Sequence, residues 1–160
     1  GKQLLPVGML VVLDSVFNRI IRNRRLGRST WVYIDEIYLL FQHEYSANFL
    51  FTLWKRVRKY GACCTGLTQN VDDLLQSHTA RTMLANSEFL VMLNQASTDR
   101  AELARLLNIS DNQLSYITNV DFGRGLIKCG SAIVPFMDHF PKNNLYRLMS
   151  TKPSEADAAV

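Results

Sequence analysis

Two adjacent carboxylates, Asp35 and Glu36, directly follow a run of strand-forming residues, Trp-Val-Tyr-Ile at 31–34. Aromatic and β-branched side chains suit a buried strand, whereas two acids at its end are costly to bury without a purpose. In nucleotide-hydrolysing α/β domains, one such acid holds the water shell of a magnesium ion and the other takes a proton from the attacking water. The segment therefore has the Walker B pattern, although acidic loops also end strands that carry no chemistry.

A second polar cluster, Thr68-Gln69-Asn70, follows another short apolar stretch at residues 62–67. Helical segments separate the two stretches, which predicts parallel pairing, and ligands of parallel sheets bind beyond the carboxyl ends of the strands. Both polar clusters are therefore expected at the same edge of the sheet. The amide of Gln69 can donate to a phosphate oxygen and accept from water without adding charge. The alternative role for Gln69 is a strand-end cap or a loop hydrogen bond.

The remaining pattern predicts an α/β fold, with a mostly parallel sheet flanked by helices and a β-hairpin near the carboxyl terminus. Apolar residues repeat at helical spacing before Arg25 and again before Gly61, and Ser110 with Gln113 has the form of a capping box. A turn at Gly130 is expected to close the hairpin. The expected helices are residues 7–25, 49–61, 71–85, 97–107 and 110–118, and the expected buried strands and hairpin strands are residues 31–34, 62–67, 88–93, 125–129 and 131–135.

Length and composition favour one globular domain, expected over residues 1–150, with a flexible tail at residues 151–160. The chain has 160 residues, of which 48% are hydrophobic and 20% charged, as in ordinary soluble proteins. No apolar run is long enough to span a bilayer, and no secretory signal pattern follows Gly1. These observations argue against a membrane-spanning or secreted chain.

The cysteines and histidines are spaced in no metal-binding pattern. Cys63 and Cys64 are adjacent on an expected strand, so their side chains point to opposite faces. With Cys129 the number of cysteines is odd, which favours a reducing compartment over a disulfide framework. No metal site made of protein side chains alone is therefore expected.

Much of the positive charge, in a chain of net charge +4, lies in two clusters. One interpretation is a surface for nucleic acid or an acidic membrane. We favour a simpler one, in which each cluster ends a helix beside a glycine, Gly27 or Gly61. Cations there complement the helix dipole, and glycine supplies the terminal turn. The clusters are Arg19, Arg22, Arg24, Arg25 and Arg28, and Lys55, Arg56, Arg58 and Lys59.

Several motifs together closely resemble those of a known family. The chain resembles the C-terminal part of the RecA-like ATPase domain of the traffic ATPases of conjugative transfer and type IV secretion. The resemblance covers nearly the whole chain except its tail, and it implies a partial RecA-like P-loop NTPase fold over residues 1–150. The segments that carry it are residues 8–14, 33–41, 66–75, 94–103 and 145–151.

The resemblance also implies roles for the polar residues at the two strand ends. Asp35 would hold magnesium through water, Glu36 would be the catalytic base, and Gln69 would contact the γ-phosphate or orient the attacking water. ATP and Mg²⁺ would be the cofactors of the parent protein. The parent would be a hexameric homo-oligomer that works with other secretion-channel and coupling proteins, at the cytoplasmic face of the bacterial cell membrane.

Ring ATPases of this kind usually receive an arginine from a neighbouring subunit, because a guanidinium neutralises charge on the transferred phosphoryl group. Arg100, Arg124 and Arg81 are the candidates. Each has a structural alternative, notably a salt bridge of Arg100 or Arg81 with a neighbouring acid.

The glycine-rich phosphate-binding loop G-x-x-x-x-G-K-[S/T] is not present in these residues, and Gly1-Lys2-Gln3 resembles only its end. That loop supplies most of the phosphate cradle. The chain alone is therefore expected neither to hydrolyse ATP measurably nor to bind ATP and Mg²⁺ tightly. A segment of such a fold would also expose a sheet edge and an apolar face, so we expect dimerisation or swapping.

Two other functions stay open. A nucleotide-free scaffold or docking module could use the same fold to hold secretion components. A DNA-translocating relative of the coupling proteins could use its basic helix ends, with Arg22, Arg24 and Arg25, to contact DNA phosphates.

Overall fold

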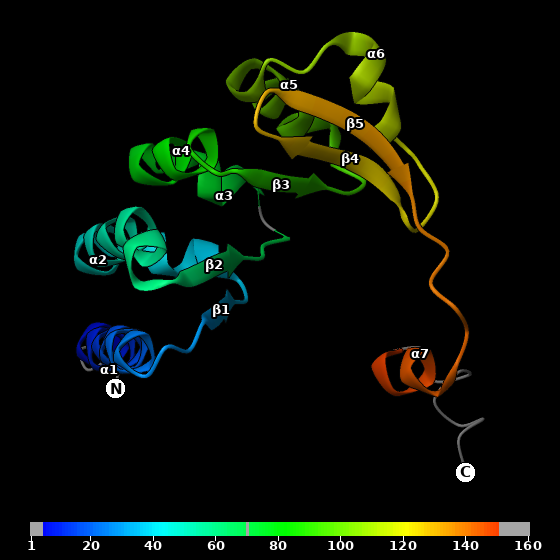
Figure 1. The fold of residues 1–160 in the computed structure, drawn as a ribbon. Helices are drawn as coiled ribbons and strands as arrows, with labels where there is room; N and C mark the ends of the chain where they lie inside the picture. The colour runs from blue at the N-terminus through cyan, green and yellow to red at the C-terminus, as the bar shows by residue number, and fades with distance from the viewer. Residues whose placement is uncertain (1–4, 70, 151–160) are drawn as a thin grey trace. The chain divides into compact units, whose positions relative to one another are not determined.

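Helix α1, Leu5–Arg25, is the first element of the computed structural model of the protein, which describes residues 5–69 and 71–150 (Figure 1). Its buried side chains include Leu13 and Ile20, which are seven residues apart and so share one helix face. Arginines in the last turn complement the negative end of the helix dipole. Gly27, with φ +67°, then turns the chain away, so the predicted helix and its glycine turn are confirmed.

Strands β1, Thr30–Ile34, and β2, Ala62–Gly66, form a parallel pair in which Thr30 lies opposite Ala62 and Ile34 opposite Gly66. The connection between them passes through two 3-10 helices and an α-helix. Because parallel strands need such a crossover, the chain covers one face of the pair with this helix on its way back. The connecting elements are η1, Ile37–Phe41, α2, Glu44–Arg56, and η2, Val57–Tyr60.

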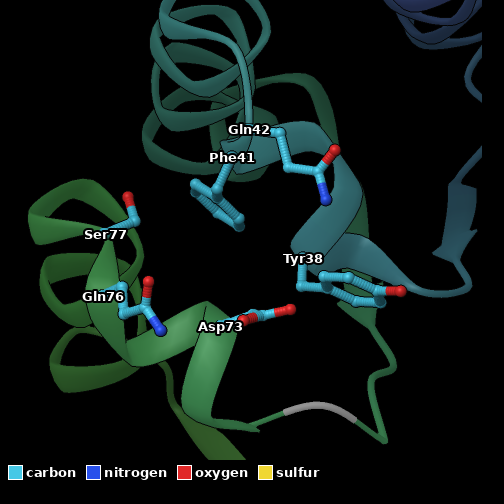
Figure 2. A pocket seen from close by; sticks show the side chains of 6 residues that line it. All are labelled: Tyr38, Phe41, Gln42, Asp73, Gln76 and Ser77. Atoms are coloured by element: carbon cyan, nitrogen blue, oxygen red, sulfur yellow. The ribbon is translucent and has the colours of Figure 1, made fainter.

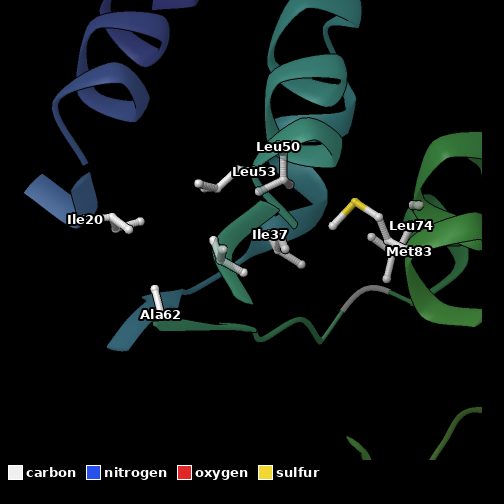
Figure 3. Packing of buried hydrophobic residues seen from close by; sticks show 9 residues of the cluster. Ile20, Ile37, Leu50, Leu53, Ala62, Leu74 and Met83 are labelled. Carbon is white, nitrogen blue, oxygen red and sulfur yellow. The ribbon is translucent and has the colours of Figure 1, made fainter. Parts of the chain in front are cut away.

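The hydrophobic core lies where α1, α2 and the inner face of the parallel pair meet (Figure 3). Ile20 and Leu50 are fully buried there, and each such side chain stabilises the fold by about 1.5–3 kcal/mol. Figure 3 shows how this cluster gathers side chains from helices and strands far apart in sequence. Its buried members are Ile20, Ile37, Leu50, Leu53, Val57, Ala62, Leu74, Ala80 and Met83.

The expectation of a buried strand at residues 31–34 is wrong for one of the two faces of β1. Val32 and Ile34 pack against the core, whereas Trp31 and Tyr33 are 65% and 67% exposed. Side chains alternate along a strand, and the helices of this unit cover only the face that carries the even-numbered residues. The parallel pair therefore presents an aromatic outer face in the described part of the chain.

The helical stretch expected at residues 71–85 is two helices, α3, Val71–Gln76, and α4, His78–Ala85. The break falls at Ser77, whose hydroxyl accepts a hydrogen bond from the backbone N–H of Ala80 at 3.3 Å. Serine favours such a cap over a helix interior, because its hydroxyl replaces a missing backbone partner. The predicted helix existed, but the cap divides it.

Strands β3, Phe89–Met92, β4, Arg124–Cys129, and β5, Ala132–Met137, form a separate antiparallel sheet in the order β3-β4-β5. The β4-β5 hairpin and its turn at Gly130 are confirmed. The mostly parallel sheet is not, because β3 pairs antiparallel with β4. Helices before a strand permit a parallel crossover but do not determine which strand becomes its hydrogen-bond partner.

The remaining helices are short, apart from α5, Ser97–Leu107, which was expected from the sequence. The capping box is confirmed at α6, Asp111–Leu114, where the Ser110 hydroxyl accepts from the Gln113 N–H and the Gln113 side chain accepts from the Ser110 N–H. The 3-10 helix η3, Ser115–Ile117, continues it. Helix α7, Asn144–Met149, was not expected, since its only local signal is the Asn143 cap.

The described residues divide into two compact units. One holds the parallel pair and comprises the chain up to Ser87 together with Ala101–Asn108; the other holds the antiparallel sheet and comprises Glu88–Arg100 and the chain from Ile109 on. The domain limits expected from the sequence stay a prediction, and the tail at 151–160 lies outside the described residues. None of the described helices combines the length and hydrophobicity needed to cross a bilayer.

Candidate functional site

The two carboxylates occupy a tight turn at the carboxyl end of β1. Glu36 adopts the left-handed conformation, with φ 48° and ψ 47°, which is strained for a residue with a side chain. The Oδ1 atom of Asp35 accepts a hydrogen bond from the Glu36 N–H at 3.0 Å and so stabilises this turn. The left-handed conformation of Glu36 turns the chain from β1 into η1. The Glu36 side chain therefore lies at the carboxyl end of the strand.

Backbone hydrogen bonds tie this turn to the end of β2. The Ile37 N–H donates to the Leu67 carbonyl at 2.9 Å, and the Leu67 N–H donates to the Ile34 carbonyl at 2.8 Å. These two bonds extend the parallel ladder by one step beyond the strands themselves. The segments that follow β1 and β2 are therefore held together, although the bonded residues lie thirty or more positions apart in sequence.

The structure brings Glu36 and Gln69 together at this edge. The Gln69 Nε2 donates to the Glu36 Oε1 at 3.4 Å, a long hydrogen bond between an exposed amide and a half-buried carboxylate. Asp35 is exposed beside them, whereas Asn70 lies outside the described residues. An acid pair and an amide thus share one solvent-accessible corner, in which a water molecule can reach both a proton acceptor and a hydrogen-bond donor.

The donors at this corner suit a hydrated magnesium ion. Mg²⁺ prefers oxygen ligands and keeps several of its waters, so one exposed carboxylate together with substrate phosphates is a common protein contribution. Within residues 5–69 and 71–150, no three side chains of His, Cys, Asp or Glu are grouped as a metal centre would require. Asp35 fits the water-mediated kind of site, because its carboxylate is exposed and none of the ion pairs between described side chains includes it.

The three candidate arginines have different surroundings. Arg81 forms an ion pair with Glu102 and also donates to the Leu75 carbonyl, so its guanidinium joins α4 to its neighbours. Arg124 lies 3.5 Å from Asp121 in an exposed pair of i,i+3 spacing. Arg100 is half-buried in α5 and takes part in none of the ion pairs between described side chains. Arg81 therefore has the salt bridge that was the structural alternative to a catalytic role, and Arg124 has only a weaker ion pair at the surface.

A hollow that the sequence did not reveal flanks the candidate site (Figure 2). Its volume is about 410 Å³, and it lies between η1 and α3, the elements that follow Glu36 and Gln69 in the chain. The ring of Phe41 faces into it, with Tyr38 beside Asp73 (Figure 2). Tyr38 and Gln42 are four residues apart, a spacing that places two side chains on one face of a helix. Nothing in the residues of η1, however, indicates that this segment is a 3-10 helix. The lining residues are Tyr38, Phe41, Gln42, Asp73, Gln76 and Ser77.

Comparisons with known proteins agree on one group. Residues 1–124 match the family model described as the TraG P-loop domain. The structure is similar to that of VirB4 of Thermoanaerobacter pseudethanolicus, with a TM-score of 0.73 and 27% sequence identity over 81% of this chain and 36% of that chain. The chain therefore spans little more than a third of the length of that VirB4. No curated protein sequence matches it.

Proposed function

The chain belongs to the TraG P-loop domain family, and from this premise we propose that it is a segment of an ATP-hydrolysing motor that energises conjugative DNA transfer and type IV secretion. Membership in this family confirms the resemblance drawn from the sequence motifs. The site at the end of the parallel pair is the part of the molecule that bears on the activity.

The observation that carries the proposal is the contact between Glu36 and Gln69. Both residues stand just beyond the carboxyl ends of adjacent parallel strands, where α/β folds bind their ligands. The 3.4 Å hydrogen bond between them is long and therefore weak, so both side chains can exchange it for contacts with a bound water, which supports the proposal. Both side chains are accessible, so a substrate phosphate can approach.

Each residue then has a distinct task. Glu36 accepts a proton from the attacking water, and Gln69 donates to the γ-phosphate or holds that water in line. Asp35 holds the waters of the magnesium ion, whose charge, when it is bound with ATP, offsets the negative charge of the phosphates. The Glu36 backbone N–H donates to the Asp35 Oδ1 in the turn, and the Glu36 carboxylate accepts from the Gln69 amide.

The chain supplies only the water-activating half of such a site. Phosphate-binding amides and a P-loop lysine would come from another part of the parent protein, and an arginine such as Arg100 or Arg124 would come from a neighbouring subunit. The parent would act as a homo-oligomeric ring with secretion-channel partners, at the cytoplasmic face of the membrane. The 160-residue chain by itself is then inactive.

The test is phosphate release by the longer parent protein and by this chain, each at saturating ATP and Mg²⁺. In the parent, Glu36→Gln should lower turnover by about 10²–10⁴-fold, because it removes the general base. Gln69→Ala should lower it by about tenfold or more through loss of one hydrogen-bond donor. Glu44→Gln, an exposed acid in the first turn of α2, is the matched control and should leave turnover unchanged.

Three results would contradict the proposal in different ways. Unchanged turnover in the Glu36→Gln parent would show that another residue is the base. Rapid hydrolysis by this chain alone, lost in Glu36→Gln, would show that the phosphate cradle is complete here. A parent that carries a P-loop yet hydrolyses no ATP would favour a scaffold or docking module.

A further inference from the structure

Two basic turns lie side by side at the amino ends of β1 and β2, the edge opposite Glu36. The Thr30 N–H donates to the Gly61 carbonyl at 3.3 Å, which joins the turn before β1 to the turn before β2. The Arg24 Nη1 lies 3.5 Å from the point that a Cβ at Gly61 would occupy, so its guanidinium spans both turns. We call this surface the basic edge, and its residues are Arg24, Arg25, Leu26, Arg28, Arg58 and Lys59.

Backbone and amide hydrogen bonds hold the first of these turns in place. The Arg28 N–H donates to the Asn23 carbonyl at 2.9 Å, and the Asn23 side chain donates to the Thr30 hydroxyl at 2.9 Å. Gly27 adopts a left-handed conformation between them. The turn is therefore shaped without any contribution from its cations, whose side chains stay available.

The five cations of the basic edge are exposed and unpaired. The ion pairs formed by the described residues involve Arg81, Arg105 and Arg124, and none of them includes a cation of this edge. The helix dipole accounts for Arg24 and Arg25 in the last turn of α1. It accounts poorly for Arg28, which lies beyond the helix, and for the residues of the short η2. A dense group of unpaired like charges raises the local potential and attracts an anionic partner.

An exposed apolar side chain within the edge indicates what kind of partner binds there. Leu26 is 58% exposed between Arg25 and Gly27. Tyr60 is half-buried and packs edge-to-face on Phe17 at 5.4 Å between ring centroids, so it offers no platform for stacking a base. Trp31, the second residue of β1, is 65% exposed beside the edge, and an indole ring suits the headgroup level of a bilayer. Basic residues around an exposed leucine suit an anionic bilayer, where cations meet headgroups and the leucine reaches the acyl boundary.

We propose that the basic edge docks this segment on an anionic lipid bilayer, with Leu26 inserted among the headgroups. This deepens the membrane-side location of the proposed function by naming the surface that makes the contact. The basic edge and the hydrolysis site lie at opposite ends of the same two strands. Lipid binding can therefore be measured without ATP. A chain that binds no lipid would contradict this inference and leave the proposed hydrolysis site untouched.

The first experiment is cosedimentation of the chain with vesicles of phosphatidylcholine alone or with added phosphatidylglycerol, at about 0.1 M salt. We expect binding only to the anionic vesicles, weakening as salt is raised. Each basic residue near such a surface strengthens binding about fivefold, so Arg24→Gln, Arg25→Gln and Arg28→Gln together should weaken it about a hundredfold. The matched control neutralises Arg105, Lys142 and Arg147, three exposed cations outside the edge, and should weaken binding less than fivefold. Circular dichroism verifies that both variants are folded.

The second variant separates lipid from nucleic acid. Leu26→Ser should weaken binding to anionic vesicles about tenfold, because the leucine no longer enters the interface, and should leave any binding to duplex DNA unchanged. Equal binding to neutral and anionic vesicles would overturn the proposal, as would equal losses in the two triple variants. Binding to duplex DNA without binding to vesicles would assign the basic edge to nucleic acid instead.

Discussion

The two ends of the parallel β1–β2 pair differ in almost every chemical respect. At the carboxyl end, acids and an amide converge in a strained turn, with Glu36 and Gln69 in contact. At the amino end, arginines and a lysine converge on relaxed turns that contain glycine. The proposals assign chemistry on a phosphate to the first end and contact with a charged surface to the second.

Parallel pairing is the physical cause of this difference. Because both strands run in the same direction, everything that follows a strand gathers at one edge and everything that precedes a strand gathers at the other. The segments that precede β1 and β2 are the carboxyl ends of helices, where the dipole favours cations and a left-handed glycine stops the helix. Parallel pairing therefore places the acids at the carboxyl ends of the two strands and the cations at their amino ends, without any direct contact between the two groups.

The largest effect on both edges should come from the core beneath them. Leu50 is fully buried in α2, so Leu50→Ala should lower the free energy of unfolding by about 3 kcal/mol. Chemical denaturation measures the loss, and amide exchange should speed up at both edges together. Leu148→Ala is the control, since Leu148 is 81% exposed, and should change stability by less than about 0.5 kcal/mol. If only one edge loosened, the edges would not share this core.

A smaller effect should separate the two edges through their glycines. A Cβ on Gly66 would lie 2.5 Å from the Ile37 Cδ1, so Gly66→Ala should cost about 2 kcal/mol and displace the start of η1. Gly27 has open space around it but a φ of +67°, so Gly27→Ala should cost about 1 kcal/mol through backbone strain alone.

Hydrogen exchange at two amides tells these variants apart. Gly66→Ala should speed exchange at the Ile37 N–H, which bonds to the Leu67 carbonyl, and leave the Arg28 N–H protected. Gly27→Ala should do the reverse. Gly27→Asn should recover part of the lost stability, because asparagine tolerates the left-handed region better than alanine. Loosening of both amides in either variant would contradict independent edges.

The smallest expected effect is a difference in cysteine reactivity between the two faces of the β1–β2 pair. Burial raises the pKa of the Cys64 thiol to about 11, and the adjacent Cys63 adds to the rise, whereas Cys63 itself is exposed. At pH 8 a thiol of that pKa is ionised in about one molecule in a thousand, so iodoacetamide should modify Cys63 well before Cys64. Raising the pH toward 10 should speed labelling of Cys64 about a hundredfold. Mass spectrometry reads both sites, and equal rates in the folded chain would mean that the faces are not distinct.

Local signals predicted a large part of this molecule. The helix that ends at Arg25, the capping box at Ser110 and the hairpin turn at Gly130 were all evident from residues within a few positions of one another. The break at Ser77 was also local, but the helical pattern on both sides concealed it. The acids at the end of β1 were recognisable for the same reason, since motif and strand are contiguous.

Pairing and burial depended on distant residues, and there the sequence was insufficient. Nothing near Phe89 indicates that β3 pairs with β4 some thirty-five residues later, so the sheet was expected to be mostly parallel. Nothing near Trp31 indicates which face of β1 the helices leave uncovered. Strand pairing and the burial of a strand face depend on contacts between segments far apart in the chain, and local propensity does not determine which of these contacts form.

The sequence by itself determined most of the helices and strands, the acid pair, the helix-ending glycines and the family. Only the tertiary structure decided that Gln69 meets Glu36, that Glu36 takes a left-handed turn and that Arg24 lies over Gly61. The physical reason is the range of the forces involved. Caps and helical periodicity depend on residues within one or two helical turns of each other. The partners of a strand, and the charged segments that meet at its ends, depend instead on segments far apart in the chain that pack together in the core.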